Sequence, residues 1–220
     1  MNRLTKAVIA GALAGTLHVS VMVFKGLSYY AAAAVFLQYL IGSVLIFYAP
    51  IRAAGWVKGL IVGTICAFPL MVLIPFNEPA GSVLTGLIVF CFLGIMLGVY
   101  GSQCDDKSTG PVPMAVIARA ALAGLGAGVI CAGLMFIKGM AAGSMAAIIG
   151  QCLVGSLLIF FAPLKLTGPI KGVIVMVASG LPIVITVPYY DPYGSAVSAL
   201  IVLGILGSLI GFYNSYQEKR

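Results

Sequence analysis

The stretch Gly42-Ser-Val-Leu-Ile-Phe-Tyr-Ala-Pro50 returns later in the chain as Gly155-Ser-Leu-Leu-Ile-Phe-Phe-Ala-Pro163. Followed outward at the same spacing, residues 1–103 align with 114–216 without a gap and share 38 identities in 103 pairs. A gapless match of this length is not expected by chance, and self-similarity at a fixed spacing indicates an internal repeat. We therefore predict a tandem duplication with three parts: a first repeat (1–103), a linker (104–113) and a second repeat (114–220).

The composition indicates that lipid is the solvent of this chain. Hydrophobic residues make up 62% of the 220 positions and charged residues only 8%, and the mean hydropathy is +1.17. A soluble domain has roughly 25% charged residues. A chain so poor in charge cannot cover a water-facing surface, so the sequence predicts an integral membrane protein.

Each repeat contains four apolar segments that are about long enough to cross a bilayer as helices. They lie at 7–24, 29–48, 57–75 and 82–101 in the first repeat, and at 120–137, 142–161, 170–188 and 195–214 in the second. The other structure that can span a membrane is a closed β-barrel, which needs an alternation of polar and apolar residues that these segments lack. We predict an all-α polytopic membrane protein with eight transmembrane helices.

Turn-forming residues separate the segments. Lys25-Gly26 and Lys138-Gly139 follow the first segment of each repeat, and prolines 75 and 188 are expected to end the third segments. The stretch 104–113 is the polar linker.

The basic residues predict the orientation. With alternating helices, Lys25 and Lys138 fall on one side, and the other ten of the twelve basic residues fall on the opposite side. These ten are Arg3, Lys6, Arg52, Lys58, Lys107, Arg119, Lys165, Lys171, Lys219 and Arg220. Lys and Arg accumulate on the cytoplasmic side, so both termini and the linker are expected there, in a prokaryotic plasma membrane. Two four-helix repeats then share one orientation and are related by an axis along the membrane normal.

Several function classes are disfavoured by the sequence. The net charge of +7 comes from scattered residues and not from a clustered patch, so no nucleic-acid partner is expected. The five cysteines show no C-x-x-C spacing, which argues against a disulfide framework or zinc site. No Asp or Glu lies within a predicted span and no catalytic motif occurs, so we expect no enzyme and no cofactor. The expected partner is the lipid bilayer, with another membrane protein or a second copy of the chain as further candidates.

Gln38 and Gln151 are the main candidates for a polar pathway. They occupy equivalent positions near the middle of the second segment of each repeat. Small residues lie one helical turn before and after them on the same face: Ala34 and Gly42 in the first repeat, Ala147 and Gly155 in the second. A buried amide needs hydrogen-bond partners. Either the two glutamines line a midplane pathway at the repeat interface, or they join neighbouring helices, which is the commoner use in membranes.

Prolines and glycines are candidates for shaping the helices. Pro69 and Pro182 lie inside the third segments and predict kinks there. Glycine pairs at four-residue spacing predict close helix crossings, and they are Gly11/Gly15, Gly94/Gly98, Gly124/Gly128 and Gly207/Gly211. The pairs Gly55/Gly59 and Gly168/Gly172, at helix entries, carry less weight.

Two further residue sets are candidates for a site. His18 and Met22 in the first repeat match Cys131 and Met135 in the second, and these four could bind a soft cation such as Cu(I) if the first helices of the two repeats met. The alternative is a hydrogen-bonded histidine with methionines filling the core. The charges on the predicted outer side are Lys25, Lys138, Glu78 and Asp191, which could form two equivalent ion pairs.

Two functions remain after these exclusions. The first is a channel-like or permease-like facilitator for a small, weakly charged solute at the repeat interface. The second is a non-catalytic structural subunit or assembly factor of a larger membrane complex. A hydrated cavity at the glutamines would favour the first, and dry packing there the second.

Overall fold

The computed structural model describes residues 2–51, 53–78, 83–104, 113–162, 164 and 166–218, apart from the side chains of Phe76 and Glu218. Within these residues all regular structure is helical and forms eight helices: α1 (Arg3–Phe24), α2 (Tyr29–Tyr48), α3 (Gly55–Asn77), α4 (Val83–Gln103), α5 (Met114–Ile137), α6 (Ala142–Phe161), α7 (Gly168–Tyr190) and α8 (Ala196–Glu218). All eight are long and apolar enough to cross a membrane. The predicted all-α fold with eight spans is confirmed, and the chain is a multi-pass integral membrane protein. Most of the predicted linker lies outside the described residues, as do Arg52, Lys107, Lys165, Lys219 and Arg220.

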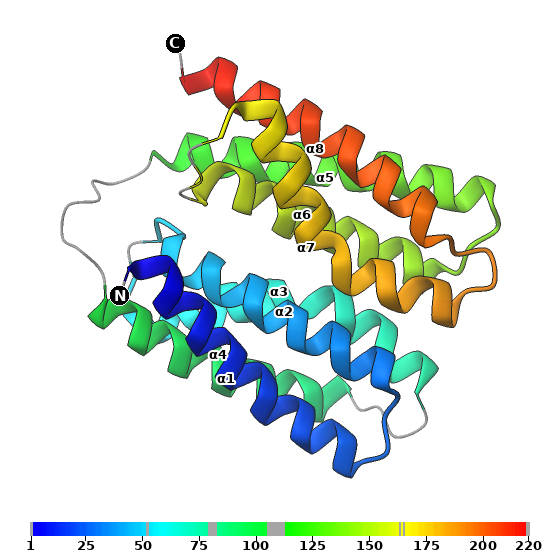
Figure 1. The fold of residues 1–220 in the computed structure, drawn as a ribbon, viewed down its shortest axis with the longest axis horizontal. Helices are drawn as coiled ribbons and strands as arrows, with labels where there is room; N and C mark the ends of the chain where they lie inside the picture. Colours follow the sequence, from blue (N-terminus) through cyan, green and yellow to red (C-terminus); the bar gives the residue numbers. More distant parts are fainter. Residues whose placement is uncertain are drawn as a thin grey trace. The chain divides into compact units, whose positions relative to one another are not determined.

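The chain divides into two compact units, Met1–Val112 and Pro113–Arg220, with four helices each. In the first unit α1 packs against α2 and α3 against α4, while α2 also contacts α3 and α4, and α1 meets α4 (Figure 1). The second unit has the same pairs, with α5 against α6, α7 against α8, and α6 between the pairs. The predicted duplication aligns the first residues of α2, α3 and α4 with the first residues of α6, α7 and α8, respectively.

The short turns between the first two helices of each unit have the same backbone conformation. Gly26 and Gly139 have φ angles of +75° and +73°, in the left-handed region that glycine adopts without a steric penalty. The sequence located these turns correctly.

The third helix of each unit is longer than predicted. Helix α3 continues through Pro75 to Asn77, and α7 continues through Pro188 to Tyr190. Proline removes one N–H donor, but later residues still donate to the carbonyls before it: Glu78 N to Ile74 O at 2.9 Å, and Asp191 N to Val187 O at 2.8 Å. These bonds carry each helix past its proline.

Backbone contact between glycines brings the third and fourth helices together. A Cβ atom added at Gly59 would lie 2.0 Å from the Gly94 carbonyl oxygen, and one at Gly172 would lie 1.8 Å from the Gly207 carbonyl oxygen. The glycines at the starts of α3 and α7, to which the sequence assigned little weight, are therefore the packing partners of the predicted pairs in α4 and α8. Small residues that let helix backbones touch are a common device in membranes.

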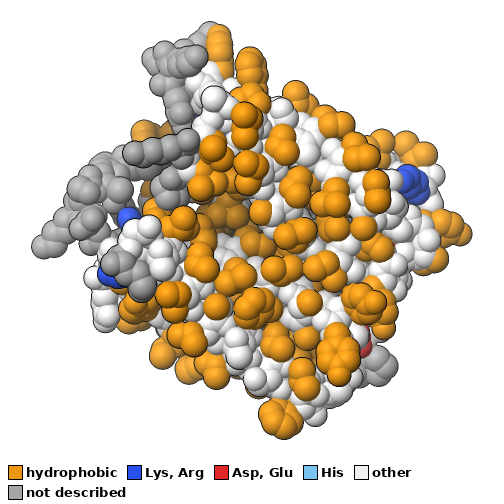
Figure 2. Space-filling view, in the orientation of Figure 1, with side chains coloured by type: hydrophobic (Ala, Val, Ile, Leu, Met, Phe, Trp, Pro, Cys, Tyr) orange, Lys and Arg blue, Asp and Glu red, His pale blue; other side chains and the backbone are white. Residues whose placement is uncertain are grey.

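The middle helices form the core of each unit. In their most apolar stretches, 61% of the residues of α2 and α6 and 56% of those of α3 and α7 are buried, against 33% in α1 and 22% in α8. Large apolar side chains on the outer helices are exposed, such as Leu13 at 64% and Leu122 at 68%. Figure 2 shows hydrophobic side chains over the visible helical surface and few charged ones. Such a surface is stable in contact with lipid chains.

Candidate functional site

The two glutamines join helices within their own units. Both side chains are completely buried. Gln38 Nε2, on α2, donates to the Cys66 carbonyl of α3 at 2.6 Å. Gln151 Nε2, on α6, donates to the carbonyl of Ser179 on α7, and Ser179 is the counterpart of Cys66 in the second repeat. These are the interhelical hydrogen bonds expected from the packing alternative.

The small residues beside each glutamine allow this approach. A Cβ atom at Gly42 would lie 3.4 Å from Cys66 Cβ, and one at Gly155 would lie 2.6 Å from Ser179 Oγ. Any larger residue at Gly155 would have to displace the ends of the Met176 and Ser179 side chains of α7.

The glutamine bonds fall in the helical turns that precede the internal prolines. Pro69 cannot donate to the carbonyl of Ile65, and the next carbonyl, that of Cys66, accepts Gln38. Pro182 and Ser179 repeat this relation in α7, where Thr186 Oγ1 also donates to the Pro182 carbonyl at 2.8 Å. Both helices continue through these prolines, and kinks at Pro69 and Pro182 stay a prediction.

Space beside Gln38 is minimal. A cavity of about 10 Å³ is lined by Gln38, Tyr39, Cys66 and Phe90 among others. A cavity needs a volume of about 10–15 Å³ to hold a single water molecule. The Oε1 atoms of Gln38 and Gln151 have no hydrogen-bond partner among the described residues. Within the first unit, therefore, the glutamine layer is closely packed, and a polar pathway at the repeat interface stays a prediction.

His18 is held by an aromatic cluster in its own unit. Its Nδ1 lies 3.0 Å from the Tyr39 hydroxyl, its ring meets the Phe90 ring edge-on at 5.0 Å, and Tyr39 stacks on Phe90 at 4.7 Å. This is the hydrogen-bonded histidine of the alternative interpretation. The second unit has Cys131 and Cys152 at the positions of His18 and Tyr39.

The described residues contain no cluster of three or more His, Cys, Asp or Glu side chains able to hold a metal ion. Met22 lies with His18 on one cavity of the first unit, and Met135 lies with Cys131 on one cavity of the second. A soft-metal site that combines all four residues across the two repeats stays a prediction.

Each unit has a cavity at the end where its first helix meets its second, which we call the Lys25 end in the first unit and the Lys138 end in the second. The first-unit cavity has a volume of about 40 Å³ and the second-unit cavity about 80 Å³. Eleven of the twelve residues lining the smaller cavity have their repeat counterparts in the lining of the larger one. The pairs are His18/Cys131, Val21/Leu134, Met22/Met135, Lys25/Lys138, Leu27/Met140, Val35/Ile148, Ile74/Val187, Pro75/Pro188, Thr85/Ser198, Gly86/Ala199 and Val89/Val202.

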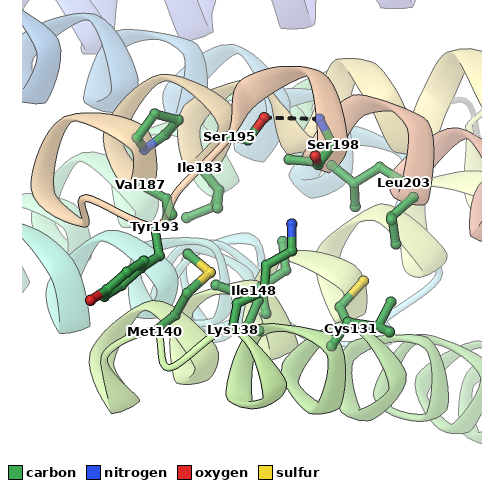
Figure 3. A pocket seen from close by; sticks show the side chains of 15 residues that line it. Cys131, Lys138, Met140, Ile148, Ile183, Val187, Tyr193, Ser195, Ser198 and Leu203 are labelled. Carbon is green, nitrogen blue, oxygen red and sulfur yellow. Dashed lines mark hydrogen bonds between the residues drawn. The ribbon is translucent and has the colours of Figure 1, made fainter.

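The second-unit cavity combines an apolar interior with a lysine and hydroxyl groups. Figure 3 shows the Lys138 side chain reaching from the end of α5 into the cavity, toward Ser195 and Ser198 at the start of α8. Ser198 N donates to Ser195 Oγ at 3.3 Å. Most of the other lining residues are apolar, with Ile148 and Leu203 among them. The arrangement can bind a small molecule that has one polar group and an apolar body.

Asp191 has a structural role beside this cavity. Its buried carboxylate accepts from Ala141 N at 2.9 Å and Ser144 Oγ at 3.2 Å, at the start of α6, and from Tyr193 N at 3.1 Å. In the first unit Ser28, the counterpart of Ala141, caps α2 by accepting from Ala31 N at 3.2 Å. Asp191 thus supplies the cap that α6 lacks locally, and the two equivalent ion pairs among the outer charges stay a prediction. Glu78, its counterpart, lies at the C-terminal end of α3.

Sequence reasoning missed the two cavities, although six of its candidate site residues line them: His18, Met22, Lys25, Cys131, Met135 and Lys138. The available signal was the recurrence of Met and Lys one turn apart at the end of each first helix. Comparisons with protein-family models, curated proteins and solved structures found no match.

Proposed function

We propose that this integral membrane protein is a permease-like facilitator that takes a small solute into the cavity at the Lys25 end and the Lys138 end of its units. The proposal moves the solute site from the glutamine layer to these two cavities. The observation that carries it is the recurrence of one cavity at equivalent positions in both units.

This recurrence is hard to explain as a packing defect. Of the eleven paired lining positions, seven differ in residue type, for example His18/Cys131 and Gly86/Ala199. Helical proteins fill their interiors closely, and independent changes of side-chain size would be expected to close a space that had no use. Both units instead keep a cavity with a lysine at its mouth.

The closely packed layer below the cavities is the closed side of the proposed site. In the first unit this layer contains Gln38, His18 and Tyr39, and the space beside Gln38 is about 10 Å³. Passage of a solute would require the helices to separate there, as transporters do when they alternate between states.

A flux measurement on reconstituted protein tests this proposal. Purified protein in liposomes should admit acetate or glycerol faster than protein-free liposomes do, in stopped-flow light scattering. Ala199→Leu fills the second-unit cavity and should lower the flux. Gly126→Ala is the matched control, because a Cβ atom there meets nothing within 4 Å and the residue is exposed. Flux no greater than in protein-free liposomes, or flux insensitive to Ala199→Leu, would overturn the proposal.

The second candidate is a non-catalytic structural subunit or assembly factor. It is favoured by the glycine crossings and by the buried Gln38 and Gln151 bonds, which hold each unit as a closely packed bundle. Under this function the cavities would be empty of transported solute, and the reconstituted protein would show no flux while its fold remained intact.

A further inference from the structure

We propose that the cavity at the Lys138 end binds an amphiphile with an anionic head, a phosphate or carboxylate, and a short apolar chain. The head would lie at Lys138 and the start of α8, and the chain among Ile148, Val187 and Leu203. The inference rests on the proposed function in that it assigns the substrate class of the same cavity.

The head end of the cavity is electropositive. Lys138 extends into it (Figure 3), and the start of α8 carries the partial positive charge of a helix N-terminus. The described residues that line the cavity include neither Asp nor Glu. Asp191 lies nearby but is not among the lining residues, and its carboxylate accepts from Ala141, Ser144 and Tyr193. An anion would gain from both positive features, whereas a cation would be repelled.

Apart from Lys138 and the serines at the start of α8, most of the cavity lining is apolar, which favours an apolar chain attached to the anionic head. Ile148, Ile183, Val187 and Leu203 are among the apolar residues that line the cavity. A volume of about 80 Å³ corresponds to roughly five to eight waters at 10–15 Å³ each. This admits a few chain carbons beside the head. Each methylene buried there should tighten binding roughly 4-fold until the space is full.

The first unit provides an internal comparison. Its cavity contains Lys25 in the position of Lys138 but has half the volume, about 40 Å³. His18 and Met71 occupy part of the space around it. An amphiphile of the same length should therefore bind the second unit more tightly than the first, and Lys25 serves as the control for Lys138.

The test is calorimetric titration of the full-length protein in detergent with hexyl phosphate. Lys138→Met should weaken binding about 10-fold or more, because it removes a charge-assisted contact, and Lys25→Met should change it far less. Hexanol and inorganic phosphate should each bind more weakly than hexyl phosphate, and hexyltrimethylammonium should not bind. Equal affinity in wild type and Lys138→Met would overturn the inference.

A cavity-filling variant distinguishes binding of hexyl phosphate inside the cavity from attraction of its phosphate to the Lys138 charge alone. Ala199→Leu keeps Lys138 but occupies the chain site, so it should also abolish hexyl phosphate binding while the melting temperature stays near that of wild type. Unchanged binding in Ala199→Leu would place the phosphate outside the cavity and overturn the inference. If Ala199→Leu is unstable, Ala199→Val makes the same test with a smaller side chain. Gly126→Ala, which lies outside the cavity lining, is the folding control, and its melting temperature and affinity should match those of wild type.

The source of the anion is decided by reconstitution. The affinity for hexyl phosphate is compared between nanodiscs of pure phosphatidylcholine and nanodiscs of phosphatidylcholine mixed with phosphatidylglycerol. A lower apparent affinity in the mixed nanodiscs would show that a lipid headgroup competes for the site. Equal affinity in both would identify a free amphiphile as the ligand. The two proposals fail separately. Binding of hexyl phosphate without any flux overturns the facilitator alone, whereas glycerol flux blocked by Ala199→Leu without hexyl phosphate binding overturns the ligand class alone.

Discussion

Replacing Gly172 by alanine should separate α7 from α8. The added Cβ atom would lie 1.8 Å from the Gly207 carbonyl oxygen, 2.7 Å from its carbonyl carbon and 3.0 Å from Gly211 Cα. All three are backbone atoms and cannot rotate aside. Ordinary contact begins at 3.4 Å, so the first of these distances must grow from 1.8 Å to at least that value. The whole crossing has to open.

The cost of this opening can be estimated. Overpacking a closely packed contact typically costs ~1–3 kcal/mol. The usual gain of about 1 kcal/mol for alanine over glycine in a helix is largely absent, because the separated helices remain helical in a lipid or detergent environment. We therefore expect Gly172→Ala to lower the free energy of unfolding by about 1–3 kcal/mol.

Denaturant titration of the purified protein in mixed micelles, followed by circular dichroism, measures this loss. Gly126→Ala makes the same chemical change at a site where a Cβ atom meets nothing within 4 Å, and it should alter the free energy of unfolding by less than about 0.5 kcal/mol. Gly59→Ala in the first unit should behave like Gly172→Ala, since its Cβ atom would lie 2.0 Å from the Gly94 carbonyl oxygen. Equal stabilities for Gly172→Ala and Gly126→Ala would refute the reasoning, because they would show that no backbone contact holds these helices.

Other consequences are open to direct measurement. Cys104 follows α4 on the side predicted to be cytoplasmic, so it should react with a membrane-impermeant thiol reagent only after cells are permeabilised; labelling of intact cells would reverse the orientation. Gln38→Leu and Gln151→Leu each remove an interhelical hydrogen bond worth roughly 0.5–2 kcal/mol in a membrane. They should lower the melting temperature without abolishing flux per molecule, whereas lost flux at unchanged stability would return the solute path to the glutamines. Asp191→Ala removes the cap on α6 and should cost about 1–2 kcal/mol, and a Ser144→Ala control, which keeps the bond to the Ala141 amide, should cost less.

The sequence alone determined the number and kind of elements in this protein. In lipid every backbone polar group needs an internal partner, so an apolar stretch of about 20 residues becomes a helix whatever lies beside it. The turns at Gly26 and Gly139 were readable for the same local reason, since the conformation depends on the residue itself. The duplication and the cytoplasmic placement of the termini are further predictions from local patterns.

The tertiary structure decided which side chains meet. No local pattern shows that Gly59 faces Gly94, because glycine spacing marks a face but not its partner. The role of Asp191 as a cap for α6 depends on a residue 50 positions from Ala141 in the chain. The cavity that unites Lys138 with Ser198 is lined by residues from all four helices of the second unit. Contacts of this kind arise from the packing of whole helices against one another, where the fit of all the side chains together selects the arrangement.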